Sequence, residues 1–291
     1  MSLIESALAK ARKIAGDSEP QASAKSRRST LRSSLGKRPA PAAPTAVATP
    51  IEPIHATPLP INFKICQEYR VLLDETAKNN ANAVAAYRIL RTRILQRARM
   101  QQWTTIGVTS ATPNDGKSLT TLNLSLSLAR ERNSEVVLLD LDMRNPSMCK
   151  YLGIEPRYHL CNYLEGRANA QDVFFSIGVE NLSIAAGTIR TELASELLGN
   201  AKLEELIQYI KQHTRNPIVL VDLPPLLSTD DALVVVPKID AILLVAAEGR
   251  TDRTALDKAV ELLTDVPLAG LVLNQAVETV ESYDYGYGPV Y

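Results

Sequence analysis

Residues 104–118 of the chain read TTIGVTSATPNDGKS, a β-forming apolar run followed by a polar loop that ends in Gly-Lys-Ser. Leu119, Leu122 and Leu126 come next and recur with helical spacing. The segment therefore predicts a strand, a tight loop and a helix in direct succession. A helix that begins after such a loop presents unpaired backbone N–H groups and the positive end of its dipole, which together attract anions.

The loop fits the P-loop pattern G-x-x-x-x-G-K-[ST] except at its first position, where Ala111 replaces glycine. Alanine is tolerable there if its φ is negative. We expect Gly116 to allow close backbone approach, Lys117 to reach the β- and γ-phosphates, and Ser118 to bind Mg²⁺. A chance Gly-Lys-Ser beside a turn is the alternative, and the strand–loop–helix context disfavours it. The predicted nucleotide-binding residues of this segment are Asn114, Asp115, Gly116, Lys117, Ser118 and Leu119.

Acidic side chains follow two other apolar runs directly. Asp140 and Asp142 come after residues 136–139, and Asp222 comes after residues 218–221. Each aspartate alone could cap the following turn. Ligands of open α/β sheets bind at the carboxyl ends of the strands, so the three carboxylates can converge near the loop. Mg²⁺ uses one or two carboxylates, waters and phosphate oxygens, and Ser118, Asp142 and Asp222 are predicted to hold it directly or through water.

The remaining pattern predicts an α/β fold with a doubly wound, mostly parallel sheet. Several apolar runs are continuous rather than alternating, as in parallel strands buried on both faces. Their spacing of about 20 to 40 residues fits repeated βαβ units. The expected strands are 104–109, 136–139, 182–186, 218–221, 241–247 and 271–273.

Composition changes along the chain and defines four predicted segments. Residues 1–15 place apolar side chains on one face of a short helix, which is marginal in isolation. Residues 16–60 are rich in Pro, Ala and Ser, and we expect a disordered linker. Residues 61–280 carry the globular pattern, and residues 281–291 form a flexible tail. The first 40 residues hold nine Lys or Arg against three Asp or Glu, so this arm is locally basic.

Charge and hydropathy exclude several classes of function. The chain has 32 basic and 32 acidic side chains, so its overall charge predicts no nucleic-acid partner. Three scattered cysteines do not form a disulfide framework. The N-terminus lacks the apolar core of a secretory signal, and the longest apolar run, 241–247, is far shorter than a membrane span. We expect a cytoplasmic protein.

Tyrosines are concentrated at the C-terminus. Four of the ten lie in the last nine residues, in the sequence SYDYGYGPVY, and they are Tyr283, Tyr285, Tyr287 and Tyr291. Glycine spacing leaves no periodic apolar face, so these rings are not expected in a core. From composition alone a merely disordered tail is the simpler interpretation. A phosphate-transferring site in the same chain makes them candidate phosphoacceptors.

The order P-loop, strand-D-x-D-x-R and strand-D-x-P resembles the bacterial tyrosine kinases of the CpsD/CapB type, in which these motifs are called Walker A, A′ and B. Similarity spans roughly residues 85–291. It includes GLVLN at 270–274, where related ATPases place an adenine-contacting asparagine, here Asn274. The opening MSLIESALAKA resembles the exosortase-associated autokinases more weakly. Partitioning ATPases of the ParA/MinD type share the fold but carry an extra lysine where this chain has Thr112.

The resemblance implies an ATP- and Mg²⁺-dependent tyrosine autokinase that phosphorylates the tail and regulates extracellular polysaccharide synthesis and export. Lys117, Asp140 and Asp142 are then catalytic, with Asp140 orienting or deprotonating the tyrosine hydroxyl. Two family arginines that seat neighbouring subunits match Arg88 and Arg91, although the family glutamate is replaced by Ala85.

The resemblance also implies partners. These are further copies of the chain, a membrane polysaccharide co-polymerase of the Wzz-like chain-length determinant type as activator, and a cognate tyrosine phosphatase. The protein would then lie at the cytoplasmic face of the inner membrane, held there by the co-polymerase. Two alternatives stay open: an ATPase switch of the ParA/MinD type without kinase activity, and a scaffold that binds nucleotide without catalysis.

Overall fold

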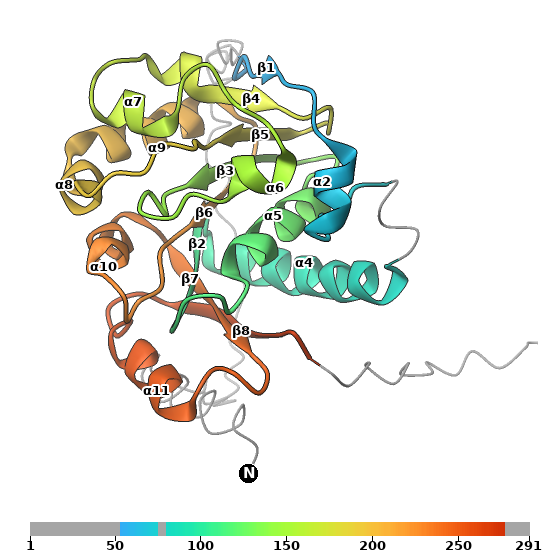
Figure 1. The fold of residues 1–291 in the computed structure, drawn as a ribbon, viewed down its shortest axis with the longest axis vertical. Coiled ribbons are helices and arrows are strands. Elements are labelled where there is room, and N and C mark those ends of the chain that lie inside the picture. The colour runs from blue at the N-terminus through green and yellow to red at the C-terminus, as the bar shows by residue number, and fades with distance from the viewer. Residues whose placement is uncertain (1–52, 75–79, 277–291) are drawn as a thin grey trace, which may run out of the picture.

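The computed structural model describes residues 53–74 and 80–276. The described strands form one sheet in the order β1-β4-β5-β3-β6-β2-β7-β8 (Figure 1). Every neighbouring pair is parallel except β4 with β5. The strands are β1 (Thr57–Pro58), β2 (Thr105–Ser110), β3 (Glu135–Asp140), β4 (Phe174–Ser176), β5 (Leu182–Ala185), β6 (Pro217–Asp222), β7 (Ala241–Ala247) and β8 (Leu268–Asn274). The predicted doubly wound, mostly parallel sheet is confirmed.

Helices cover both faces of the sheet. One face packs against α2 (Phe63–Glu68), α4 (Ala81–Gln101), α5 (Lys117–Leu128) and α6 (Met148–Leu152). The other packs against α7 (Leu160–Leu164), α8 (Ala194–Gly199), α9 (Ala201–His213), α10 (Asp231–Val235) and α11 (Arg253–Glu261). Two 3₁₀ turns, η1 (Ala170–Val173) and η2 (Val236–Lys238), complete the described elements.

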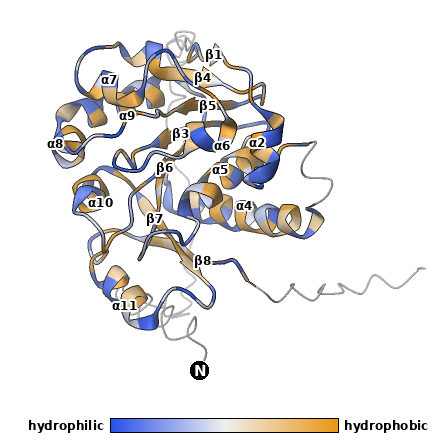
Figure 2. Cartoon of the chain, viewed as in Figure 1, coloured by the Kyte–Doolittle hydropathy of each residue, from blue (hydrophilic) through white to orange (hydrophobic). Residues whose placement is uncertain are grey.

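The central strands are apolar because both of their faces are buried. In β3, Val136 and Leu138 belong to one core cluster, while Val137 and Leu139 belong to the other. Side chains alternate across a strand, so a continuous apolar run is needed to fill two cores at once. Figure 2 shows the result as hydrophobic strands at the centre of the molecule.

The folded part begins earlier than the sequence predicts. The range 16–60 was expected to be linker, but β1 lies inside it and pairs with β4. The backbone N–H of Leu59 also donates to the carbonyl of Ser176, at 2.9 Å. Residues 53–60 therefore belong to the domain. The predicted helix over residues 1–15 and the tail over 281–291 lie outside the described residues.

The carboxyl ends of three adjacent strands meet at one edge of the sheet. Asp140 at the end of β3 is the direct register partner of Asp222 at the end of β6. Val108 of β2 is paired with Asp222 on its other side. β2 then runs into the P-loop, so the topology alone brings the loop beside both carboxylates.

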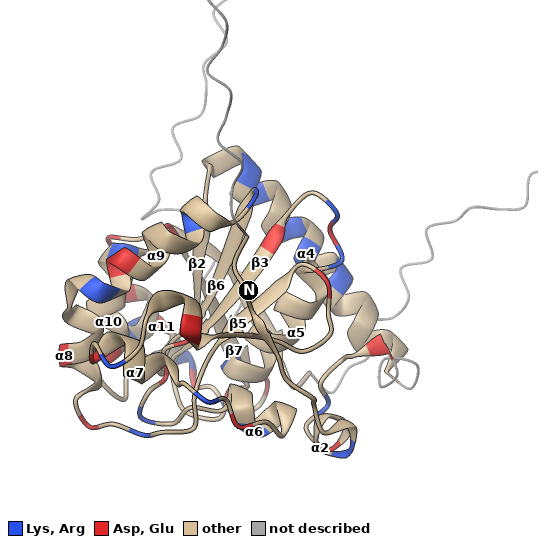
Figure 3. Cartoon of the chain, turned by 90° about the horizontal axis from the view of Figure 1, so that it is seen from above, with Lys and Arg blue, Asp and Glu red and all other residues tan. Residues whose placement is uncertain are grey.

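Charged side chains are distributed unevenly over the helices. Lys and Arg recur along α4, as Figure 3 shows from above the view of Figure 1. No helix of the described part of the chain is both long and apolar enough to span a membrane.

Candidate nucleotide site

The P-loop connects β2 to α5 and contains two residues in the left-handed region. Asn114 has φ 65° and Gly116, which caps α5, has φ 88°. Ala111 is fully buried and is not among the residues with positive φ, so alanine at the first motif position is compatible with the loop. Asp115 is also buried, and its carboxylate accepts from the backbone N–H (3.1 Å) and hydroxyl of Thr112. Asp115 thus stabilises the loop with its side chain and can offer a ligand its backbone N–H.

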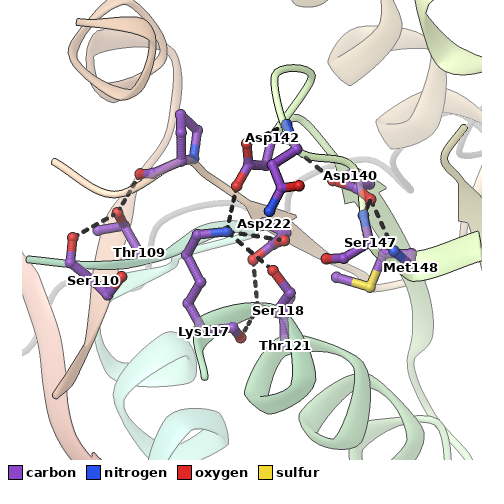
Figure 4. Close-up of polar contacts among 12 residues, drawn as sticks. Thr109, Ser110, Lys117, Ser118, Thr121, Asp140, Asp142, Ser147, Met148 and Asp222 are labelled. Carbon is purple, nitrogen blue, oxygen red and sulfur yellow. Dashed lines mark hydrogen bonds and ion pairs between the residues drawn. The ribbon is translucent and has the colours of Figure 1, made fainter. Parts of the chain in front are cut away.

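Lys117 is the first residue of α5, and its ammonium group lies among acidic side chains (Figure 4). Nζ is 2.6 Å from Oδ2 of Asp142 and 3.6 Å from Oδ2 of Asp222. It also donates to the hydroxyl of Ser118, at 3.0 Å. Burial disfavours the cation, but the Asp222 and Asp142 carboxylates outweigh it and raise the pKa of Lys117 above its usual value. The lysine is therefore positively charged at physiological pH.

Asp222 is completely buried, and its two carboxylate oxygens differ in their hydrogen bonding. Oδ1 accepts from the hydroxyl of Thr121, at 3.2 Å, whereas Oδ2 accepts no hydrogen bond from the described residues. Burial raises the pKa of this carboxyl above its usual range, against the opposing effect of Lys117. An under-satisfied buried carboxylate oxygen beside a P-loop is a site that a cation would stabilise.

Asp140 holds the chain that follows β3. Its Oδ2 accepts from the backbone N–H groups of Ser147 and Met148, both at 3.1 Å, and Oδ1 accepts from the N–H of Asp142, at 3.3 Å. Burial and the neighbouring Asp222 carboxylate raise the pKa of Asp140 to about 8. In this structure Asp140 fixes the loop that carries Asp142; its role as a catalytic base stays a prediction.

Arg144, the last residue of the D-x-D-x-R motif, ties this loop to α10. Its guanidinium donates to both oxygens of Asp231, at 2.6 and 3.1 Å, and to Glu192, at 2.9 Å. Asp231 also accepts from the hydroxyl of Ser195. These partners lower the pKa of Asp231 despite its burial. The sequence did not reveal the role of Arg144, because its partners lie 48 and 87 residues further along the chain.

The residues at the end of β8 contact the P-loop through two side-chain amides. The amide of Asn274 donates to the carbonyl of Asp115, at 3.0 Å, and the amide of Gln275 donates to the carbonyl of Asn114, at 3.2 Å. Asn274 is therefore at the predicted nucleotide site, and its contact with adenine stays a prediction. Gln275 was missed, although its position directly after Asn274 was a signal.

The remaining predicted residues do not contact the Lys117, Asp142 and Asp222 side chains in the described structure. Leu119 is half-buried in α5. Arg88 is exposed on α4, and Arg91 is turned inward, where it donates to the carbonyl of Ser127 at 3.0 Å. The role of both arginines in a surface for a neighbouring subunit stays a prediction. The four tail tyrosines lie outside the described residues.

Thr121 is a further site residue that was not predicted from the sequence. It lies four positions after Lys117, hence on the same face of α5, and its hydroxyl is within hydrogen-bond distance of two acceptors, the Lys117 carbonyl (2.8 Å) and Oδ1 of Asp222 (3.2 Å). That spacing was a signal in the sequence. Among the described residues, no three His, Cys, Asp or Glu side chains are grouped as a metal cage.

Comparison with known proteins matches the chain to a P-loop NTPase family and to tyrosine-protein kinases. Residues 102–284 match the ParA family, described as the NUBPL iron-transfer P-loop NTPase. The chain is 31% identical over 188 residues to the tyrosine-protein kinase CpsD of Streptococcus agalactiae, covering 63% of this chain and 81% of that protein. It is 27% identical to the tyrosine-protein kinase YwqD of Bacillus subtilis, covering 69% and 84%.

A solved structure agrees with these relatives. The kinase domain of the Escherichia coli tyrosine kinase ETK superposes with a TM-score of 0.63 at 26% identity, over 70% of this chain and 80% of that one.

Proposed function

This chain belongs to the ParA family of P-loop NTPases and, within it, to the bacterial tyrosine kinases, and we propose that it transfers phosphate from ATP to tyrosines of its own C-terminal tail. One observation carries the proposal. Lys117 of a P-loop is buried between Asp142 and Asp222, at the sheet edge where strands β3 and β6 end.

The residues present fit a magnesium–nucleotide pair. The under-satisfied Oδ2 of Asp222 lies beside Ser118 and Asp142, and these three offer the hard oxygen ligands that Mg²⁺ prefers. Lys117 and the backbone N–H groups of the loop offer positive charge to phosphates. We assign Ser118, Asp142 and Asp222 to the metal. We assign the loop from Asn114 to Leu119, with Asn274, to the nucleotide.

Phosphoryl transfer requires positioning and charge neutralisation more than covalent help from the protein. When bound, ATP supplies the phosphoryl group and Mg²⁺ offsets its charge. Lys117 stabilises the negative charge of the phosphates, and Thr121 keeps Asp222 in place. Asp140, at the end of β3 beside Asp222, is assigned to orient the tyrosine hydroxyl and accept its proton.

The acceptors are Tyr283, Tyr285, Tyr287 and Tyr291. In support, Asn274 and Gln275, which lie before the tail in the chain, contact the P-loop. Each added phosphate contributes about −1.5 to −2 charges. We propose that the accumulating repulsion dissociates an assembly of identical subunits, in which Arg88 and Arg91 on α4 contact the neighbouring copy.

The polysaccharide role and the partners follow from the family. We assign the protein to regulation of extracellular polysaccharide synthesis, at the inner membrane. There a Wzz-like co-polymerase activates it and a tyrosine phosphatase reverses the modification. The amphipathic segment 1–15 and the basic arm are the proposed contact with the co-polymerase.

The proposal is tested by incubating the purified full chain with Mg²⁺ and ATP, and mapping added phosphate on C-terminal peptides by mass spectrometry. Lys117→Met is the control. We expect phosphotyrosine in the wild type and none in the variant. ATP hydrolysis without phosphotyrosine, persisting after addition of the cytoplasmic part of the co-polymerase, would contradict the kinase assignment and favour an ATPase switch.

A further inference from the structure

Gln275 directly follows Asn274, the last residue of β8, and contacts the P-loop. Its φ of 57° lies in the left-handed region, and so does that of Asn114, at 65°. The two residues face each other, because Nε2 of Gln275 donates to the carbonyl oxygen of Asn114 at 3.2 Å. Non-glycine residues adopt this conformation at a cost, and such residues cluster at functional sites.

Two consecutive carbonyls of the loop are held in this way. Asn274 donates to the carbonyl of Asp115, at 3.0 Å, next to the bond made by Gln275. In a trans peptide the C=O and the following N–H point in opposite directions, and the described residues contain no cis peptide. The N–H groups of Asp115 and Gly116 must therefore point away from the two amides.

The close approach of this segment is built into the loop. A Cβ on Gly116 would lie 2.0 Å from Nδ2 of Asn274, so the amide occupies the space that any other side chain would need. The N–H groups of Asp115 and Gly116 consequently face the side of the loop opposite the Asn274 and Gln275 amides. Neighbouring backbone N–H groups on one side of a loop can bind an anion.

We propose that Gln275 is a positioning residue for the nucleotide phosphates: by holding the Asn114 carbonyl, it orients the N–H of Asp115 toward them. The inference rests on the proposed nucleotide site and adds a residue to it. Gln275 acts through the loop backbone and does not touch the reacting atoms.

The test is equilibrium binding of a fluorescent N-methylanthraniloyl ADP with Mg²⁺ to the full-length protein. Gln275→Met keeps the length of the side chain and removes the donor. Gln275→Gly removes the side chain and relieves the left-handed backbone. Gln208→Met, at an exposed position of α9, is the matched control.

We expect both Gln275 variants to bind the labelled ADP roughly 3- to 10-fold more weakly, which is the usual size of one lost hydrogen bond. Gln275→Gly should unfold at a temperature equal to or above that of the wild type. In kinase assays, KM for ATP should rise more than kcat falls. Gln208→Met should match the wild type in each measurement.

Unchanged affinity in both Gln275 variants would overturn the inference, and so would losses that track a lower unfolding temperature. The binding assay needs no phosphotyrosine. A wild type that binds ADP but makes no phosphotyrosine, even with the cytoplasmic part of the co-polymerase added, would refute the kinase function and leave the role of Gln275 measurable. Equal ADP affinity of the wild type and Gln275 variants, with intact tail phosphorylation, would refute Gln275 alone.

Discussion

A buried lysine among three carboxylates serves as an internal counter-ion. Lys117 is 2.6 Å from Asp142 and 3.6 Å from Asp222, and burial raises the pKa of both Asp140 and Asp222. Removing one partner of such a group leaves the others buried and unpaired, which costs more than the pair itself contributes. The same residues that bind phosphate therefore also determine the stability of the ligand-free protein.

Lys117→Met should lower the free energy of unfolding by about 3 kcal/mol at neutral pH, because it leaves the buried carboxylates without a cationic partner. Urea unfolding followed by circular dichroism measures this. Adding Asp142→Asn to Lys117→Met should recover part of the loss, since that carboxylate is nearest to Nζ. A double variant no more stable than the single one would contradict the explanation.

Asp231 gives a pH-dependent contribution to stability. Its folded-state pKa is lowered by Arg144 and Ser195, so it stabilises the fold above its unfolded pKa, about 3.9. That stability is lost as the pH falls through the lower, folded pKa. Asp231→Asn should thus be less stable than the wild type at pH 7, with the difference shrinking below about pH 4.

Urea midpoints of both proteins between pH 7 and pH 3 would show this convergence. Asp265→Asn, at an exposed position, is the control and should follow the wild type much more closely. A stability gap for Asp231→Asn that is constant across this range would rule out the ion pair as its cause.

At the level of elements, the sequence predicted the strands that are formed by long, continuous apolar runs. β3 and β6 are continuous and apolar, so their ends, and with them Asp140 and Asp222, could be placed at one sheet edge. β1 and β4 have two and three residues, too few to show a period. The inward orientation of the Arg91 side chain could not be predicted from the sequence either, because it depends on how closely α4 approaches α5.

Packing at the centre of the sheet leaves little space beside Gly107 of β2. A Cβ on Gly107 of β2 would lie 2.6 to 2.9 Å from the side-chain ends of Ile239, Ile242 and Leu223. Gly107→Ala should therefore destabilise the protein by about 1–3 kcal/mol through overpacking. Gly270→Ala on β8 is the matched control, because its Cβ would meet Leu243 at an ordinary 3.5 Å. Thermal unfolding should separate the two; equal melting temperatures would refute the packing argument.

For the whole molecule, the domain boundary matters for any experiment on the N-terminal arm. β1 and Leu59 are part of the sheet edge, whereas residues 1–52 lie outside the described fold. A truncation designed on the predicted linker, residues 16–60, would remove structural contacts together with the arm. The sequence could not place this boundary, because proline-rich composition continues into β1.

Deletion of residues 1–60 should lower the unfolding temperature measurably, while deletion of residues 1–52 should leave it near that of the full chain. Differential scanning calorimetry compares the two. Binding of the co-polymerase should be lost in both deletions if the arm is the contact. Equal unfolding temperatures for the two deletions would show that β1 adds nothing to the fold.

The strand order also separates the two ends of the described chain. The polypeptide enters at β1, on one edge of the sheet, and leaves at β8, on the opposite edge. Seven strand spacings of about 4.8 Å place these edges about 34 Å apart. The first and last described residues thus lie at opposite edges of the domain, separated by the full width of the sheet.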